Sequence, residues 1–259
     1  MKEILDLRVT YSEKVGAGCV LLKAVPVEGH LPVCLPGQFA QLRVDAPDVF
    51  LRRPISIHDV EGDEISFLVQ VVGDGTRWLG DLKEGDVLNA VLPLGRGFTI
   101  GSEKGNALLV GGGVGVAPLL LLGKTLKAKG FSPIFLLGAR TKSLLLCLDA
   151  FRKVGEVYVT TEDASEGERG FVTQHSLWNS DWLKASGKGN RIYVCGPGPM
   201  MKAVAKMAVE RDIPCEVSLE NRMACGVGAC LCCVEEMADG HNHCVCTDGP
   251  VFDVKDWKF

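Results

Sequence analysis

Residues 107–118 read ALLVGGGVGVAP, which combines a short apolar strand, a glycine-rich turn and the first residues of a helix. A turn of bare backbone that leads into the positive end of a helix suits the phosphate of a nucleotide. The match to the dinucleotide pattern G-x-G-x-x-G is partial, because Val116 stands at the third glycine position counted from Gly111. A tight strand–helix turn without a ligand needs similar residues, so the stretch predicts the start of an α/β unit and only suggests a nucleotide site.

The chain after this turn alternates between apolar strands and helical stretches, which predicts a doubly wound parallel sheet within residues 98–220. A second glycine-rich strand end, Cys195-Gly196-Pro197, precedes a later helix. Ligands bind at the carboxyl ends of parallel strands, so two such ends in one domain favour a nucleotide cleft. Cys195 is either a contact to that ligand or a small buried thiol. The predicted nucleotide-binding residues are Gly111, Gly112, Gly113, Gly115, Cys195, Gly196 and Pro197.

The chain before the turn, residues 1–97, has short apolar runs bounded by Gly, Pro and Asp, which predicts a small antiparallel β-barrel. A short helix is expected over 76–82, and the polar, glycine-rich stretch 95–106 is expected to link the two domains. Pro54 predicts a strand edge or a bend. Arg52 and Arg53 beside it could grip a pyrophosphate, although arginines on a solvated strand face would look the same.

Six of the eleven cysteines lie between 225 and 246, in the third segment, residues 221–259. The spacing Cys225-x4-Cys230-x2-Cys233 followed by a later cysteine is typical of a plant-type 2Fe–2S cluster. Spacing alone leaves Cys244 and Cys246 open as the fourth ligand. The alternative is a structural zinc site, in which Cys230-x2-Cys233 would join Cys244-x-Cys246 or His241 and His243.

The bulk composition excludes several classes of function. With 28 basic and 32 acidic residues and a net charge of −4, there is no electrostatic case for nucleic acid or an anionic membrane as partner. The N-terminus carries charges where a signal peptide needs an apolar core, and the apolar runs are too short to span a bilayer. We therefore expect a cytoplasmic protein whose cysteines are not disulfide-bonded.

The motifs Arg53-Pro54-x-Ser56, Gly75-Thr76, the glycine-rich turn and Cys195-Gly196-Pro197, in this order, resemble the ferredoxin–NAD(P)+ reductase superfamily. In that superfamily a barrel binds flavin and the next domain binds nicotinamide. The segments 223–230 and 246–252 are similar to those of the electron-transfer subunits of NAD-dependent (class 1B) dihydroorotate dehydrogenases. This resemblance implies that FAD is bound by Arg53, Pro54, Ile55, Ser56, Leu68, Val69, Gln70, Gly75 and Thr76, that NAD is bound by the glycine-rich residues named above, and that the cluster ligands are Cys225, Cys230, Cys233 and Cys246. The chain departs from the superfamily at Ile55, where an aromatic residue is common, and at Val69 and Gln70, where Tyr and Arg often stand.

The resemblance further implies a role as one subunit of a heterotetramer. An FMN-containing catalytic subunit would oxidise dihydroorotate, and electrons would pass through the cluster and FAD here to NAD+, with no dedicated catalytic acid or base in this chain. The expected preference for NAD over NADP rests on the family and on the acidic residues Glu162 and Asp163, which would repel the 2′-phosphate of NADP if they line the cleft. The alternatives are a flavin and iron–sulfur subunit of a sulfide dehydrogenase, ferredoxin–NADP reductase or hydrogenase complex, and a non-enzymatic zinc-binding interaction module.

Overall fold

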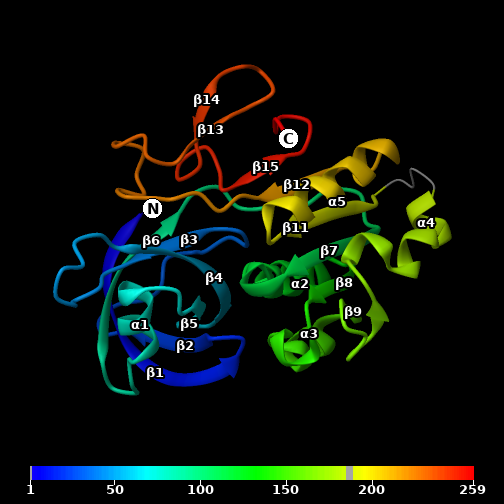
Figure 1. Cartoon of the computed structure of the whole chain (residues 1–259). Helices are drawn as coiled ribbons and strands as arrows, with labels where there is room; N and C mark the ends of the chain where they lie inside the picture. The colour runs from blue at the N-terminus through cyan, green and yellow to red at the C-terminus, as the bar shows by residue number, and fades with distance from the viewer. Residues whose placement is uncertain (1, 185–188) are drawn as a thin grey trace.

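The structure is a computed structural model that describes residues 2–184 and 189–259. Its N-terminal barrel and its α/β domain lie side by side, and the C-terminal segment runs across both (Figure 1). Within the described residues, no helix is both long and apolar enough to cross a membrane.

The barrel is closed and antiparallel, with the strand order β1-β2-β5-β4-β3-β6. Its interior is apolar, because alternate strand residues such as Leu7, Leu22, Phe67 and Leu88 point inward and are fully buried. The helix α1 begins two residues before the expected position, since the turn that precedes it is held by the Thr76 hydroxyl. The elements are β1 (Glu3–Gly16), β2 (Cys19–Pro26), β3 (Phe39–Leu42), β4 (Arg53–Glu61), β5 (Glu64–Gln70), α1 (Asp74–Gly80) and β6 (Val87–Leu94).

Pro54 lies in a stretch of β4 that pairs on one side only. Residues 53–56 pair with β3, whereas the pairing of β4 with β5 begins at Ile57. A proline has no N–H to give to a ladder, so it is tolerated where one edge of the strand is unpaired. The Arg-Pro-Ile-Ser segment therefore lies at an edge of β4 that β5 does not pair with.

The α/β domain is a seven-stranded sheet with the order β10-β9-β8-β7-β11-β12-β15. Leu109, Phe135 and Tyr193 point to the face covered by α2 and α3, whereas Leu108 and Val194 point to the face covered by α5. Helices on both faces of parallel strands make the sheet doubly wound, as predicted. The elements are β7 (Asn106–Gly112), α2 (Leu119–Ala128), β8 (Ser132–Ala139), α3 (Leu148–Val154), β9 (Glu156–Thr161), β10 (Glu168–Arg169), α4 (Asp181–Lys184), β11 (Arg191–Cys195), α5 (Gly198–Glu210) and β12 (Cys215–Ser218), with 3-10 turns at η1 (Gly113–Val116), η2 (Lys142–Leu144), η3 (Val172–Gln174) and η4 (Ser176–Asn179).

The C-terminal segment has more regular structure than its sequence indicates. It forms a hairpin of β13 (Val234–Glu236) and β14 (Asn242–Cys244), and then β15 (Val251–Asp253), which pairs antiparallel with β12 at the edge of the large sheet. The N–H of Arg96, in the link between the other two domains, donates to the carbonyl of Gly249 at 2.6 Å. The segment is therefore anchored both to the sheet and to the interdomain link.

The barrel and the α/β domain are joined directly at the start of α2. His58 of β4 is buried, and its Nδ1 donates to the carbonyl oxygen of Ala117 at 2.7 Å. Lys124 of α2 forms ion pairs with Asp59 and Glu61 of β4. These contacts set the position of the glycine-rich turn relative to the barrel.

Candidate cofactor sites

The cluster loop, residues 225–233, brings backbone N–H groups onto a thiol. The N–H groups of Val227 and Cys230 both lie 3.4 Å from Sγ of Cys225. Hydrogen bonds to the ionised form favour it, and here they lower the pKa of Cys225 to about 6. A thiolate is the form that binds iron, so this loop is prepared for a metal ligand at Cys225.

The second pair of thiols lies where the hairpin meets the loop. Cys233 and Cys246 are 2% and 1% exposed, and the N–H of Cys246 lies 3.4 Å from Sγ of Cys233. Burial and a side-chain hydrogen bond with Cys233 raise the pKa of Cys246. Two thiol pairs, one on the loop and one at the hairpin, suit a cluster of two irons, each of which takes two protein ligands.

Cys244 and Cys232 differ from these four in their surroundings. The N–H of Cys244 donates to the carboxylate of Asp248 at 2.8 Å within a turn, and the Cys244 pKa is raised by burial and by the charges of Cys233 and Asp248. Cys232 is exposed. Within the described residues no three His, Cys, Asp or Glu side chains gather as a single metal ion would require.

In the proposed FAD segment, the two neighbouring arginines have different partners. Arg52 is held by the barrel, because its guanidinium donates to the carbonyl of Gln41 at 3.2 Å and to Oδ1 of Asn89 at 2.6 Å. Arg53 donates from Nη1 to the carbonyl of Leu51 at 2.7 Å. Its other guanidinium nitrogens have no hydrogen-bond partner among the described residues, so we expect Arg53 rather than Arg52 to bind a ligand such as a pyrophosphate.

Gly75 is where the Arg53 side chain crosses the start of α1. A Cβ at Gly75 would lie 2.5 Å from Nε of Arg53, so no larger residue fits without moving the guanidinium. The Thr76 hydroxyl accepts the N–H groups of Val72 and Gly73 at 2.9 and 3.0 Å and so shapes this turn. The cradle of Arg53 and bare backbone fits the phosphates of a dinucleotide.

The other residues of the proposed FAD segment are placed by the strand ladders. Ile55 and Ser56 lie opposite Ala40 and Phe39 of β3, and both are half-buried. Leu68 packs toward the α/β domain. The Val69 side chain is fully buried in the barrel core, so only the backbone of Val69 can contact a ligand outside the barrel. Gln70 is exposed at the end of β5.

A cavity of about 560 Å³ lies at the carboxyl ends of the parallel strands. Its floor includes Gly112 and Gly113 after β7, and Pro197 after β11. Gln70 of the barrel also lines it, so the cavity extends to the proposed FAD segment. The size and position suit a dinucleotide held next to a flavin.

The remaining predicted glycines allow two turns to pack together. A Cβ at Gly115 would lie 2.4 Å from Cα of Gly196, and a Cβ at Gly111 would lie 2.9 Å from the Leu119 side chain. Cys195 is 1% exposed, and burial raises its pKa far above the ordinary value. These surroundings fit a buried neutral thiol, the second of the two interpretations drawn from the sequence.

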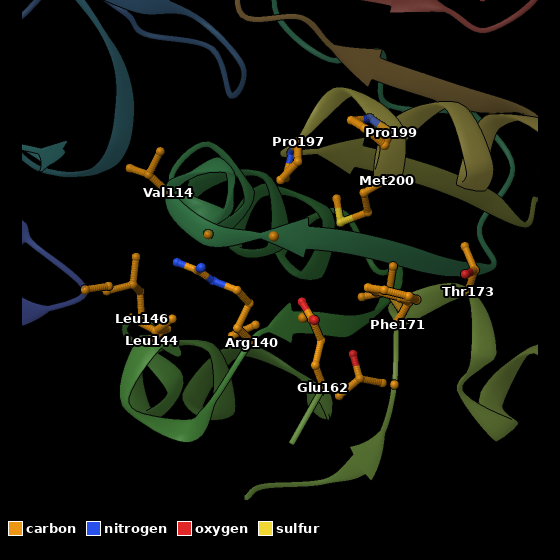
Figure 2. Close-up of a pocket in the computed structure, with 18 of the residues that line it drawn as sticks. Val114, Arg140, Leu144, Leu146, Glu162, Phe171, Thr173, Pro197, Pro199 and Met200 are labelled. Atoms are coloured by element: carbon orange, nitrogen blue, oxygen red, sulfur yellow. The ribbon is translucent and has the colours of Figure 1, made fainter. Parts of the chain in front are cut away.

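Two charged residues, neither of which belongs to a glycine-rich motif, point into this cavity. Figure 2 shows the guanidinium of Arg140 and the carboxylate of Glu162 directed into the same space, from the ends of β8 and β9. Asp163 is directed elsewhere, since its carboxylate accepts the N–H and hydroxyl of Ser165 at 3.0 and 2.6 Å. Phe171 and Met200 close the opposite side. Arg140 directly follows β8 and Glu162 directly follows β9, so a position at the carboxyl end of a parallel strand is the signal that could have identified both.

Two segments of the chain match known protein families. Residues 220–257 match the family described as the iron–sulfur cluster binding domain of dihydroorotate dehydrogenase B, and residues 109–206 match the oxidoreductase NAD-binding domain. The chain is 40% identical over 233 residues to the dihydroorotate dehydrogenase B (NAD(+)) electron transfer subunit of Fusobacterium nucleatum subsp. nucleatum, with 85% of this chain and 86% of that protein covered. The chain belongs to this family. The subunit of the same name from Caldanaerobacter subterraneus subsp. tengcongensis is 41% identical over 220 residues, with 84% of each chain covered.

Solved structures extend the similarity to the whole fold. The structure of an NADH-dependent reduced ferredoxin-NADP oxidoreductase aligns with a TM-score of 0.83 at 32% identity, over 97% of this chain and 89% of that chain. A ferredoxin reductase of carbazole 1,9a-dioxygenase aligns with a TM-score of 0.69 at 21% identity, over 82% of this chain and 67% of that chain, which shows the shared fold alone.

Membership of the dihydroorotate dehydrogenase B electron transfer subunit family confirms the resemblance stated from the motifs. It also confirms an oxidoreductase subunit with FAD, a 2Fe–2S cluster and NAD as its cofactors. The zinc-binding interaction module is the weaker interpretation, because the matched C-terminal domain is an iron–sulfur one.

Proposed function

We propose that this chain works with an FMN-containing catalytic subunit in a heterotetramer, and carries the electrons of dihydroorotate oxidation through its cluster and FAD to NAD+. The observation that carries the proposal is that three cofactor-fitting sites lie in one continuous fold. The cluster segment is anchored to the link that follows the barrel and to β12 of the nucleotide sheet, so the sites hold fixed positions.

Each group of residues has one task in this scheme. Cys225, Cys230, Cys233 and Cys246 hold the cluster. Arg53 binds the phosphates of FAD, and the bare backbone of Gly75 allows it to do so. When bound, these groups supply one-electron exchange at the cluster, one- or two-electron exchange at the flavin and hydride exchange at the nicotinamide.

Residues of the cavity orient NAD and exclude water from it. The backbone at Gly112 and Gly113 admits the close approach of a pyrophosphate, and Arg140 supplies a positive charge beside it. Glu162 faces the same cavity and disfavours the 2′-phosphate of NADP, which supports NAD as the substrate. Among the titratable groups of the described part of this site we assign none as a general acid or base.

The tip of the cluster loop is suited to meet the partner. Val227 and Leu231 are apolar but 45% and 60% exposed, and Cys230 and Cys232 are exposed beside them. Apolar side chains at the centre of a contact are typical of protein interfaces. A partner seated here would approach the cluster end of the chain.

We further propose that the protein works in the cytoplasm, where thiols stay reduced.

The test is to purify the cofactor-loaded chain anaerobically, alone and together with its FMN-containing partner. We expect the chain alone to carry flavin and iron–sulfur absorption and to oxidise NADH with an artificial one-electron acceptor, but to leave dihydroorotate unchanged. Oxidation of dihydroorotate by the chain alone contradicts the proposal. The rival function is that of a subunit of a ferredoxin–NADP oxidoreductase complex, since the chain is 32% identical to a chain of such an oxidoreductase. Isolation of a ferredoxin–NADP oxidoreductase partner from the native host would favour it.

A further inference from the structure

Gln41 of β3 is a buried glutamine whose amide has no partner. Its side chain is 1% exposed, and neither Nε2 nor Oε1 forms a hydrogen bond with the described residues. Buried polar groups in folded proteins are almost always hydrogen-bonded, because the loss of water must be compensated. An unpaired amide at this depth therefore indicates a ligand or group that completes it.

The alternation of β3 places this amide outside the barrel. Ala40 and Leu42 belong to the barrel core, whereas Phe39 packs into the core that includes Cys233 and Cys246. Gln41 shares the face of Phe39, since successive side chains of a strand point to opposite sides. Its amide is thus directed from the barrel toward the cluster segment.

The side chain of Gln41 ends against the cluster loop. A Cβ at Gly226 would lie 2.6 Å from both Cγ and Nε2 of Gln41, so the amide touches the backbone of the residue that follows Cys225. Gly226 has a φ of +70°. A glycine is required there both for this backbone conformation and for the approach of the amide.

We propose that Gln41 is a positioning residue for the cluster, whose Nε2–H donates a hydrogen bond to a cluster sulfur on the Cys225 side. The inference rests on the function proposed above, since it requires a cluster at these four cysteines. It assigns a partner to the one glutamine amide that is buried and unpaired among the described residues.

The consequence of such a bond is a higher reduction potential. The reduced cluster carries one more negative charge than the oxidised one, so an N–H donor stabilises the reduced form more. Gln41 also lies opposite Pro54 in the ladder of β3 and β4, beside the proposed FAD segment. The same strand pair therefore sets the cluster potential and borders the flavin that exchanges electrons with it.

The experiment is a potentiometric titration followed by EPR on the cofactor-loaded full chain, comparing wild type with Gln41→Leu. We expect the variant to retain its cluster, with the equilibrium for reduction shifted about tenfold toward the oxidised form. For a one-electron couple, this shift corresponds to a cluster midpoint potential about 59 mV lower than that of the wild type. The FAD midpoint, measured in the same samples, should stay unchanged.

Two further variants separate this effect from general damage. Gln41→Glu keeps the shape but replaces the donor with an acceptor, so its cluster potential should fall at least as far, and it carries the test if Gln41→Leu does not load a cluster. Gln38→Leu is the matched control, because the Gln38 amide binds Leu35 and Gly95 at 2.7 and 2.8 Å, and its cluster potential should not move. Loaded Gln41 variants with the wild-type midpoint, or an equal shift in Gln38→Leu, overturn the inference. A wild-type chain without a 2Fe–2S signal overturns the proposed function itself.

Discussion

Replacement of Gly115 by alanine tests whether the two glycine-rich turns must touch for NADH to be used. The added Cβ would lie 2.4 Å from Cα and 2.6 Å from the backbone N of Gly196. Non-bonded carbon atoms rest about 3.5–4.0 Å apart, so the turns must separate by about 1 Å. Both partners are backbone, so no side chain can rotate away to relieve the contact.

This separation has a cost in stability and a larger cost in function. Overpacking of this kind costs about 1–3 kcal/mol, which lowers Tm by about 2–12 °C in a chain of this size. Gly113 and Pro197 line the cavity next to the two turns, so they move apart as well. A misplacement of about 1 Å reduces a reaction that depends on alignment by about 100-fold. We expect kcat/KM for NADH to fall about 10- to 100-fold.

The assay is anaerobic stopped-flow reduction of the bound flavin by NADH, with cofactor content and Tm measured on the same samples. Gly198→Ala is the matched control, because a Cβ there meets nothing within 4 Å and the residue opens α5 in the same turn. Flavin reduction by Gly115→Ala at the wild-type rate would refute the assignment of these turns to the NAD site.

Two other substitutions test the remaining sites. Gly75→Ala displaces the Arg53 guanidinium and should weaken FAD binding about 10- to 100-fold, which is the loss in affinity expected when one charge-assisted hydrogen bond is removed. The Tm of the FAD-free chain should stay nearly unchanged. Gly73→Ala is the control, because a Cβ there meets nothing within 4 Å, and it should bind FAD normally in the same titration. Cys246→Ser should lower iron and sulfide content and remove the 2Fe–2S EPR signal, whereas Cys244→Ser should keep both; the reverse pattern would make Cys244 the fourth ligand.

The fold was accessible from the sequence wherever the pattern is local. The apolar strand before Gly111 and the helix after it predicted the α/β unit, because the change from strand to helix periodicity lies within a dozen residues. The strand β15 was missed, because Val251–Asp253 is only three residues long and is defined by its pairing with β12, far away in sequence. Short strands of this kind depend on tertiary contacts rather than on their own residues.

The sites were accessible to different extents for the same reason. Cysteine spacing is a local signal, and it identified the cluster segment directly. The roles of Arg52 and Arg53 could not be separated, because only the barrel shows that Arg52 is held by Asn89. Arg140 and Gln41 were not named as site residues, since the sequence does not show which strand ends and which strand faces come together across the fold.

Dihydroorotate-dependent NADH formation in the reconstituted complex is the most direct measure of electron transfer through the cluster. The FMN-containing subunit combined with the wild-type chain should form NADH, and the same subunit combined with Cys225→Ser should still oxidise dihydroorotate with an artificial acceptor but form almost no NADH. NADH formation at the wild-type rate by the Cys225→Ser complex would contradict electron transfer through this cluster.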